Sequence, residues 1–368
     1  MEHGPSRGGK WNMERPQIQF KLHRMPPPPF PKVSEDGSKK GSEFSSSRHP
    51  KRRRTLVPDS LDQTNKNKKD KPECSPKRRT FLKQIVVLGA GAALPFKNSK
   101  ASILSWDKFF QKHYQEMTAE DKKAVFARIQ REIKTDYGRD VTISDPQAIK
   151  GVKFTFCLNL SKCNGSRYCV AACVKENNQS RDPQIQFIKV LEMPHGTLNP
   201  EKGNLYYEGK SVPQKNKFYI PVQCNQCDNP PCVKVCPVKA TWKQEDGIVV
   251  IDYDWCIGCR YCQAACPYEA RHFNFKKPSI PKDEINPKQA YLSNRIRPKG
   301  VMEKCSFCLH RTREGKLPAC LEACPTGARK FGNILDENSV ISKIFQRKRI
   351  FVLKEELNTI PRFFYYFE

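Results

Sequence analysis

The clearest pattern of apolar and polar positions precedes residue 140 and predicts a helix over residues 105–136. Val125, Ile129 and Ile133 recur every four residues, so they share one face of a helix. Thr118 begins a stretch with acidic residues in its first turn, which favours a helix N-terminus there. Beyond this segment the apolar runs are short, and they predict small elements.

Two short apolar runs, 218–222 and 248–251, predict strands. The stretch 178–222 has scattered Gly and Pro and is expected to form a surface excursion. The aromatic tail, residues 362–368, is expected to be a strand packed on its own domain, with docking on a partner as the alternative. No run of 18 or more apolar residues occurs, so no membrane-spanning helix is expected.

Composition separates the first 77 residues from the rest. They hold 18 Lys and Arg, 9 Asp and Glu, and 11 of the 29 prolines. Such a segment buries too little apolar surface to offset chain entropy, so residues 1–77 are predicted to be a disordered basic extension. The whole chain has a formal net charge of +28, which raises the question of nucleic acid. A solvated surface, or bound groups of negative charge, accounts for the excess as well.

Residues 78–101 resemble a twin-arginine export signal. Arg78 and Arg79 precede Phe-Leu-Lys and a mildly apolar run over 85–96, and Ser99-x-Ala101 offers small residues for cleavage. The alternative is a short buried helix after a basic linker. Because 77 residues precede the signal, either translation starts later or the extension stays on the cytoplasmic side. The signal predicts export of the folded protein to the periplasmic face of the cytoplasmic membrane.

The 17 cysteines carry most of the chemical information. Cys74 and Cys157 stand alone. The others form four groups: Cys163, Cys169 and Cys173; Cys224, Cys227, Cys232 and Cys236; Cys256, Cys259, Cys262 and Cys266; and Cys305, Cys308, Cys320 and Cys324. The third group, C-x2-C-x2-C-x3-C followed by Pro, is the bacterial ferredoxin run, in which the fourth cysteine binds the neighbouring cluster. The second and fourth groups are the same device with longer loops, and each also ends in Cys-Pro.

Two other uses of cysteine compete with iron–sulfur ligation. Disulfides are common in exported proteins, but they do not require repeated runs of this spacing. Structural zinc favours two well-separated Cys-x2-Cys pairs, or one such pair and a spaced His pair, and no His pair completes these groups. Haem attachment needs Cys-x2-Cys-His, whereas Leu309 follows the pair at 305–308. The spacing therefore predicts iron–sulfur clusters.

Exchange of the fourth ligand between groups predicts four sites. Three of them are [4Fe–4S] sites, with the ligands Cys224, Cys227, Cys232 and Cys266; Cys256, Cys259, Cys262 and Cys236; and Cys305, Cys308, Cys320 and Cys173. The fourth has only Cys163, Cys169 and Cys324, because Ser166 stands where the third group has Cys259. Three outcomes are open there: a [3Fe–4S] cluster, a fourth ligand from the Ser166 alkoxide or a folded-back Cys157, or loss of the cluster.

Residues 115–368 resemble the iron–sulfur subunits of the complex iron–sulfur molybdoenzymes and their quinone-linked relatives, which include the polysulfide, dimethyl sulfoxide and nitrite reductases and alternative complex III. The resemblance lies in the order and spacing of the four groups and in the stretches 169–178, 223–232, 254–262 and 304–327. Ser166 departs from the pattern. The resemblance implies two partners: a catalytic molybdopterin or cytochrome subunit, and a polytopic quinone-reactive membrane subunit.

The expected fold class is α+β, because short strands alternate with helices that begin within the Cys-x3-Cys steps. Two bacterial-ferredoxin-like modules would be interleaved, one built from the outer cysteine groups and one from the inner groups. The predicted organisation is a disordered extension (1–77), an export signal (78–101), a helical segment (102–150), a four-cluster domain (151–335) and a tail of helix or strand (336–368).

The residues show no nucleophile–base pair, phosphate loop or open metal position, so they predict a relay and not a catalyst. The predicted function is transfer of single electrons through up to four clusters, between a quinone-reactive membrane subunit and a catalytic subunit of a respiratory complex. A stand-alone polyferredoxin is the alternative among redox proteins. A metal protein that binds nucleic acid is the alternative from another class; the export signal and the lack of a basic, aromatic stacking face argue against it.

Overall fold

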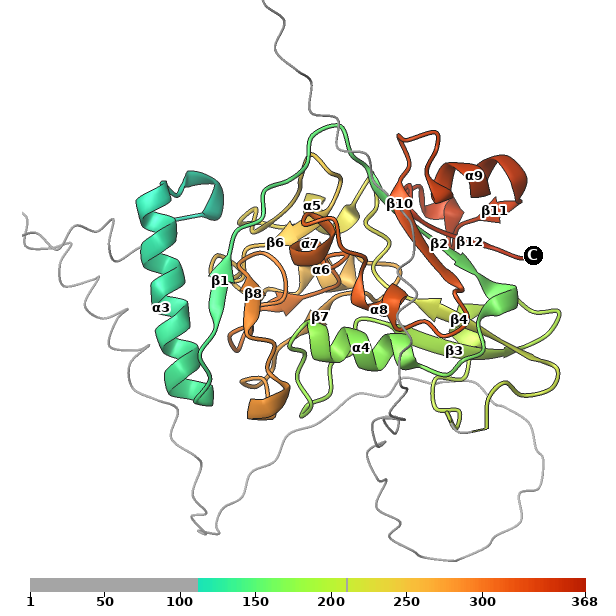
Figure 1. The fold of residues 1–368 in the computed structure, drawn as a ribbon, viewed down its shortest axis with the longest axis horizontal. Coiled ribbons are helices and arrows are strands. Elements are labelled where there is room, and N and C mark those ends of the chain that lie inside the picture. The colour runs from blue at the N-terminus through green and yellow to red at the C-terminus, as the bar shows by residue number, and fades with distance from the viewer. Residues whose placement is uncertain (1–111, 210) are drawn as a thin grey trace, which may run out of the picture. The chain divides into compact units, whose positions relative to one another are not determined.

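In the computed structural model, the described residues are 112–209 and 211–368. The predicted basic extension (1–77) and the predicted export signal (78–101) lie outside them. The described part combines short helices with small sheets, so its class is α+β, as expected (Figure 1). Within it, no helix is both long enough and apolar enough to cross a membrane.

The elements are short and follow one another closely along the chain. The α-helices are α3 (Ala119–Tyr137), α4 (Tyr168–Glu176), α5 (Pro231–Lys234), α6 (Tyr261–Ala264), α7 (Leu309–Thr312), α8 (Ala319–Glu322) and α9 (Val340–Arg347). The strands are β1 (Thr142–Ser144), β2 (Phe154–Asn159), β3 (Lys189–Pro194), β4 (Lys217–Val222), β5 (Thr241–Lys243), β6 (Val249–Ile251), β7 (His272–Phe273), β8 (Lys288–Ala290), β9 (Met302–Glu303), β10 (Arg329–Asn333), β11 (Ile350–Phe351) and β12 (Phe363–Tyr366).

The helix α3 begins later than predicted. Thr118 caps it: the Thr118 hydroxyl accepts a hydrogen bond from the Asp121 N–H (3.2 Å), and the Asp121 carboxylate accepts one from the Thr118 N–H (3.0 Å). Residues 114–116, ahead of this cap, form a separate 3₁₀ turn. The prediction of one continuous helix over 105–136 is therefore wrong at its start, because the cap satisfies the first backbone donors and fixes where the helix begins.

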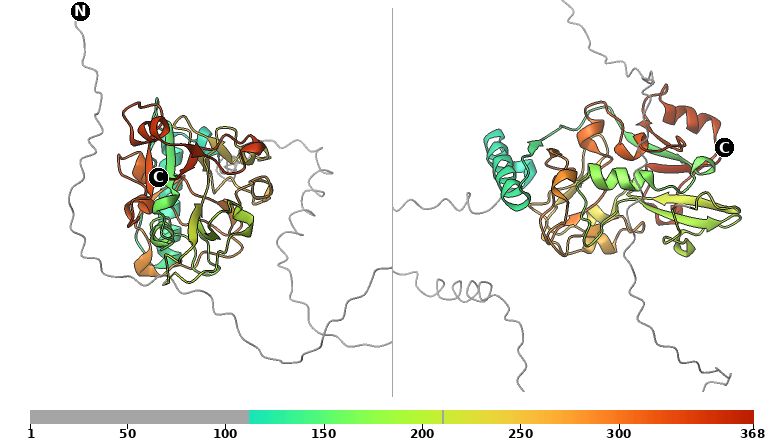
Figure 2. Two further views of the ribbon diagram at one scale, coloured as in Figure 1. Left: turned by 90° about the vertical axis from the view of Figure 1, so that its right-hand side faces the viewer. Right: turned by 60° about the horizontal axis from the view of Figure 1, so that its bottom comes forward.

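The largest sheet has the strand order β10-β2-β12-β11. Its strand β2 pairs antiparallel with β10 and parallel with β12. The strand predicted over 362–368 is confirmed as β12, and it packs on its own domain, since Phe363 and Tyr365 are fully buried. Figures 1 and 2 show this sheet and α9 at the opposite end of the described part from α3.

The two strands predicted from apolar runs are confirmed as β4 and β6. Strand β4 pairs with β3, and β6 pairs with β5, both antiparallel. The prediction that 178–222 is only a surface excursion is wrong, because Phe187, Ile188 and Val190 are at most 3 % exposed. Scattered Gly and Pro hide this pattern in the sequence. The stretch enters the core at Phe187 and Ile188, just before β3, and at Val190 within β3.

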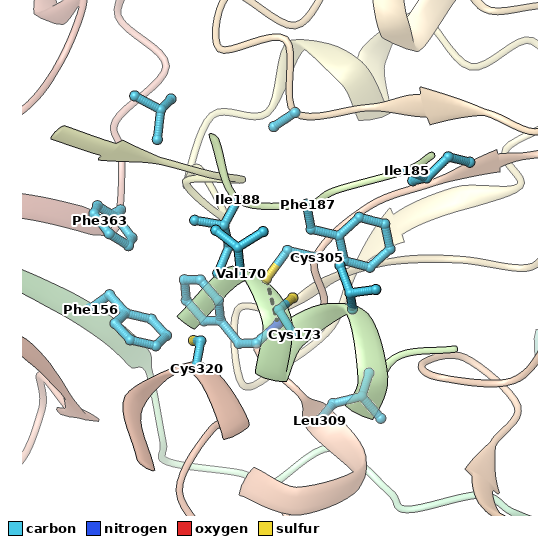
Figure 3. Packing of buried hydrophobic residues seen from close by; sticks show 14 of the residues in the cluster. Phe156, Val170, Cys173, Ile185, Phe187, Ile188, Cys305, Leu309, Cys320 and Phe363 are labelled. Atoms are coloured by element: carbon cyan, nitrogen blue, oxygen red, sulfur yellow. Dashed lines mark hydrogen bonds between the residues drawn. The ribbon is translucent and has the colours of Figure 1, made fainter. Parts of the chain in front are cut away.

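Each Cys-x3-Cys step carries a short helix, which confirms the predicted position to within one residue. The helices α4, α5, α6 and α8 each begin one residue before the first cysteine of such a step. The apolar core surrounds these cysteines. Figure 3 shows Cys173, Cys305 and Cys320 among apolar side chains, with Phe156 to one side and Phe187 to the other. The fold therefore buries cysteine sulfur within its apolar core.

Candidate iron–sulfur centres

The loops of the first and third cysteine groups have the same backbone path. In the first loop, Gly165 (φ 76°) and Arg167 (φ 58°) are left-handed; in the third loop, Gly258 (φ 70°) and Arg260 (φ 64°) are left-handed at the equivalent positions. Such residues turn the chain so that successive N–H groups converge, which makes a concavity suited to an anionic group. Each loop then enters a helix, α4 or α6, that carries the next cysteine.

Site A consists of Cys236, Cys256, Cys259 and Cys262. These four cysteines line one cavity. Three come from the third group and Cys236 comes from the second. Burial raises the pKa of Cys256, and the negative charges of Cys236 and Cys259 raise it further. Cys259 is exposed, so site A reaches the surface.

Site B consists of Cys224, Cys227, Cys232 and Cys266. Burial raises the pKa of Cys227 to about 12, and the other three cysteines contribute to this rise through their negative charge. Cys266 belongs to the third group, so it reaches site B from the loop that supplies most of site A. The structure thus brings together the four residues that the exchange of fourth ligands predicted for this site.

Site C consists of Cys173, Cys305, Cys308 and Cys320, all of them buried. Burial raises the pKa of Cys173, and the negative charges of the other three raise it further. Cys173 comes from the first group and the others come from the fourth. Figure 3 shows three of the four in the apolar core, between strand β2 and the buried residues that precede β3.

Site D consists of Cys163, Cys169 and Cys324. They line a second cavity, and Ser166 lines it with them. Burial raises the pKa of Cys163 to about 12, and Cys169 and Cys324 are among the charges that raise it further. The Ser166 N–H donates a hydrogen bond to the Asn164 side chain (3.2 Å). The structure therefore gathers three thiols and one hydroxyl at site D.

Cys157 lies away from site D. Its side chain packs against Ile341 and Tyr366, on the opposite face of β2 from Phe156 and Leu158, which belong to the main core. Burial raises its pKa to about 12. The alternative in which Cys157 folds back as a fourth ligand is wrong, because strand pairing on both sides holds Cys157 in the sheet.

The sites follow one another in a row. Burial raises the pKa of the thiols of Cys262, Cys305 and Cys320. The negative charge of one cysteine from a neighbouring site raises each of these pKa values further: Cys232 acts on Cys262, Cys224 on Cys305, and Cys169 on Cys320. The first pair joins site A to site B, the second joins B to C, and the third joins C to D. The order along the molecule is therefore A, B, C, D.

Several side chains that donate to sulfur were missed by the sequence analysis. The Arg271 Nη2 lies 3.0 Å from the Cys232 sulfur, and the Gln179 amide donates to the Cys173 sulfur at 3.2 Å. Hydrogen bonds to cluster sulfurs are one means by which proteins set potentials. A signal for one of them was present: Cys-Pro-x-x-Ala-Arg occurs twice, at 266–271 and at 324–329.

The donor sets fit iron–sulfur clusters. All cysteines in the described part are free thiols. Four thiolates around one zinc ion would stand about 3.8 Å apart. In residues 112–209 and 211–368, no three His, Cys, Asp or Glu side chains gather closely enough for one metal ion. The cysteines of sites A and D surround cavities instead, which is the arrangement that a larger body such as a cluster requires.

Comparisons with known proteins agree with this chemistry. Models of the 4Fe-4S dicluster domain match residues 162–240, 215–285 and 283–334. The chain is 43 % identical to the Hdr-like menaquinol oxidoreductase iron-sulfur subunit 1 of Archaeoglobus fulgidus, over 54 % of this chain and 71 % of the relative. It is 36 % identical to the iron-sulfur cluster-binding subunit of the menaquinone reductase of Nitratidesulfovibrio vulgaris, over 58 % and 88 %.

A third relative is the arsenate respiratory reductase iron-sulfur subunit of a Shewanella species, which is 34 % identical over 56 % of this chain and 93 % of the relative. Fold, cysteine groups and matched models define an iron–sulfur protein of the ferredoxin type. More particularly, the chain belongs to the family of iron–sulfur electron-transfer subunits of respiratory oxidoreductase complexes, and its function is electron relay.

Proposed function

We propose that the chain conducts single electrons through [4Fe–4S] clusters at sites A, B and C and through a fourth cluster at site D. The observation that carries the proposal is the gathering of four cysteines at each of sites A, B and C, three from one group and one from another. Each cluster, when bound, takes up and releases one electron. The chain's own residues hold the sulfurs, donate hydrogen bonds to them and exclude water.

The fold that goes with this proposal is a pair of interleaved ferredoxin-like modules. Sites A and B exchange Cys236 and Cys266, and sites C and D exchange Cys173 and Cys324. The inner cysteine groups would form one module and the outer groups the other. The reciprocal positions of these four cysteines support this arrangement.

For site D we propose a [3Fe–4S] cluster, which needs only three thiolates, or a four-iron cluster with Ser166 as alkoxide ligand. The presence of Ser166 in the same cavity as Cys163, Cys169 and Cys324 supports both forms. An empty site D is the remaining alternative. Iron content and EPR of the oxidised protein separate the three. A three-iron cluster gives an EPR signal when oxidised, the serine-ligated cluster holds one more iron without that signal, and an empty site D lacks the iron of a whole cluster.

The partners proposed are a quinone-reactive membrane subunit and a catalytic molybdopterin or cytochrome subunit. The names of the relatives, which include a menaquinol oxidoreductase and an arsenate respiratory reductase, support this pair. Site A is proposed as one terminus of the relay. Cys259 is exposed there, and Ile257, Tyr261 and Phe275 are 63 %, 64 % and 58 % exposed, as residues at a docking face are.

Export by the twin-arginine route, to the periplasmic face of the membrane, completes the proposal. It rests on residues 78–101 of the sequence alone. This route carries folded proteins, which suits a chain that must acquire clusters before it crosses. Fractionation of cells that express the full chain, with and without Arg78→Lys and Arg79→Lys together, tests it, because an export signal requires the substituted chain to stay in the cytoplasm.

The experiment that tests the central proposal is anaerobic purification of the full chain, with iron and acid-labile sulfide measured per chain. We expect about fifteen to sixteen iron atoms, a broad brown absorption that dithionite bleaches, and co-purification with a larger subunit. A colourless zinc protein with salt-dependent affinity for DNA would support the nucleic-acid alternative instead. Clusters without any partner would support the stand-alone polyferredoxin.

A further inference from the structure

Buried cationic side chains in the described part fall into two classes. In the first, each cation is paired with a carboxylate at 2.8–3.2 Å; the pairs are Arg295 with Asp254, Arg297 with Glu303, Arg313 with Asp246, and Arg362 with Asp228. Arg271, Lys304 and Arg329 form the second class. Each is 2 % exposed, and no carboxylate of residues 112–209 and 211–368 pairs with any of them. A buried charge is costly unless it is paired, so these three need another source of negative charge.

Arg271 lies between sites A and B. Its Nη2 is 3.0 Å from the sulfur of Cys232, which belongs to site B. The negative charges of Cys232 and of Cys262, a site A residue, raise the pKa of Arg271 although its burial acts in the opposite direction. Its Nε and Nη1 have no hydrogen-bond partner in the described part. The guanidinium thus faces the sulfurs of both sites with donors to spare.

Arg329 occupies the equivalent place between sites C and D. Its Nη1 lies 3.7 Å from the sulfur of Cys320, in site C, and its Nη2 lies 3.6 Å from the sulfur of Cys169, in site D. The Gln223 side chain accepts a further hydrogen bond from Nη1 at 2.7 Å and fixes the guanidinium in the gap. Arg271 and Arg329 both end a Cys-Pro-x-x-Ala-Arg segment, so the two gaps are built alike.

Lys304 lies between sites B and C. Its Nζ donates a hydrogen bond to the carbonyl oxygen of Cys305, a site C residue, at 2.8 Å. The same carbonyl accepts one at 2.7 Å from the side chain of Gln226, which belongs to the loop of site B. Burial lowers the pKa of Lys304, whereas the negative charge of Cys224 in site B raises it.

We propose that Arg271, Lys304 and Arg329 are junction cations: each places one positive charge in the gap between two neighbouring clusters and raises the reduction potentials of both. The proposal rests on the relay proposed above. A cluster held at either neighbouring site would gain one negative charge on reduction, and the cation between the two sites would face that charge from either side. A fixed cation in the gap stabilises the reduced form of both neighbours and weakens their mutual repulsion.

The test is an EPR-monitored redox titration of the full chain with one junction cation replaced. Lys304→Met should shift the reduced-to-oxidised ratio of the clusters at sites B and C at least tenfold toward oxidation, which is about 59 mV per cluster for one electron. The reduced-to-oxidised ratio of the clusters at sites A and D should change less than threefold. Arg329→Met should shift this ratio at sites C and D, and Arg271→Met should shift it at sites A and B.

Charge-retaining variants separate electrostatics from packing. Lys304→Arg, Arg271→Lys and Arg329→Lys should leave the reduced-to-oxidised ratio of every cluster within threefold of the wild-type ratio. Lys330→Met is the matched control: it removes the same charge from the next position of β10, whose side chain points to the other side of the strand and is partly exposed. Lys330→Met should change the reduced-to-oxidised ratio of no cluster by more than threefold.

Three results would overturn the proposal. One is unchanged potentials in all Met variants, and another is a shift of equal size in Lys330→Met. The third is loss of clusters in every Met variant while the charge-retaining variants assemble normally and titrate away from the wild type, since the three cations would then act on packing. If one Met variant does not assemble its clusters, the redox titrations of the other two Met variants still test the proposal. A wild-type chain without clusters would instead refute the relay itself.

Discussion

The loops of sites D and A, residues 163–173 and 256–266, are close in sequence and share a backbone path, yet they differ at one ligand position. Ser166 stands at the position of Cys259, while the left-handed glycine and arginine on either side occupy equivalent places. The path of the loop therefore does not depend on the ligand at this position. Backbone conformation fixes where the side chain points, and the residue type decides what it binds.

The surroundings of the two loops differ more than the loops do. At site A, Arg260 and Tyr261 are exposed. At site D, the stretch between β3 and β4 covers the loop: the Tyr207 hydroxyl donates to the carbonyl oxygen of Gly165 at 2.6 Å, and the Arg167 guanidinium lies 3.9 Å from the centre of the Tyr207 ring. One copy of the loop is thus exposed, and the other is covered by the stretch between β3 and β4.

The largest expected effect comes from exchanging the ligand residues. Ser166→Cys supplies site D with a fourth thiol on an unchanged backbone, so we expect one more iron per chain and loss of the EPR signal of an oxidised three-iron cluster. Cys259→Ser should do the reverse at site A. Iron analysis and EPR of the oxidised protein measure both.

Ser166→Ala is the control for site D. If Ser166 is an alkoxide ligand, the alanine variant loses one iron; if the site holds three irons, its iron content does not change. Should Ser166→Cys bind no additional iron in a chain whose site D holds a three-iron cluster, the equivalence of the two loops would be refuted.

Removing either left-handed glycine should reduce stability, and more strongly at site A. A Cβ on Gly258 would lie 2.0 Å from the carbonyl oxygen of Gly300, and one on Gly165 would lie 2.5 Å from the Tyr219 ring. Left-handed strain of about 1–2 kcal/mol applies to both. Overpacking adds about 1–3 kcal/mol and falls at the upper end where backbone must move. We expect Gly258→Ala to lower the free energy of unfolding by about 4 kcal/mol and Gly165→Ala by about 3 kcal/mol.

Anaerobic thermal unfolding, followed by the visible absorption of the clusters, measures this difference. Gly196→Ala is a suitable control, because its φ of +85° is also left-handed but nothing lies within 4 Å of the added Cβ. It should cost only the strain. Equal losses in all three variants would show that strain alone, and not the close approach to each loop, governs their stability.

The sequence predicted those structural features that depend on residues close together in the chain, and missed those that depend on contacts between distant segments. The capping residues at 118–121 and the helices at the Cys-x3-Cys steps depend on residues a few positions apart, so the sequence indicated them, although the helix predicted from 105 in fact begins at Ala119. The burial of residues 187–190 and the position of Cys157 on the second face of β2 depend on strand pairing between distant segments, which spacing does not encode.

The candidate sites divide in the same way. Cysteine spacing predicted which sulfurs come together, because the fourth ligand of each ferredoxin run lies a fixed step beyond the third. It did not predict Lys304 between sites B and C. A single lysine before a cysteine has no periodic signature, and its neighbours at Cys224 and Cys232 lie about seventy to eighty residues away in the sequence. The repeated arginine at 271 and 329 was visible, but only its burial against sulfur gives it meaning.

The smallest effect expected concerns the left-handed arginines. Arg260→Gly relieves strain of about 1–2 kcal/mol but gives up about 0.5–1 kcal/mol of backbone entropy and a weak cation–π contact with Phe273, whose ring centre is 5.4 Å away. We expect a change within about 0.5 kcal/mol. Arg167→Gly also loses the closer contact with Tyr207 and a hydrogen bond to the carbonyl oxygen of Leu205. We expect a loss of about 2 kcal/mol there, since a hydrogen bond from a charged donor contributes about 1.5–3 kcal/mol.

The same thermal unfolding measures both arginine variants, and Arg167→Lys is the control because it keeps the charge but loses the planar stacking. It should fall between the wild type and Arg167→Gly. The difference between the two glycine variants isolates what the covering stretch contributes, because strain and entropy are common to both loops and cancel. If Arg260→Gly were as destabilising as Arg167→Gly, the contacts with Tyr207 and Leu205 would contribute nothing measurable, and the 178–222 stretch would cover site D without stabilising its loop.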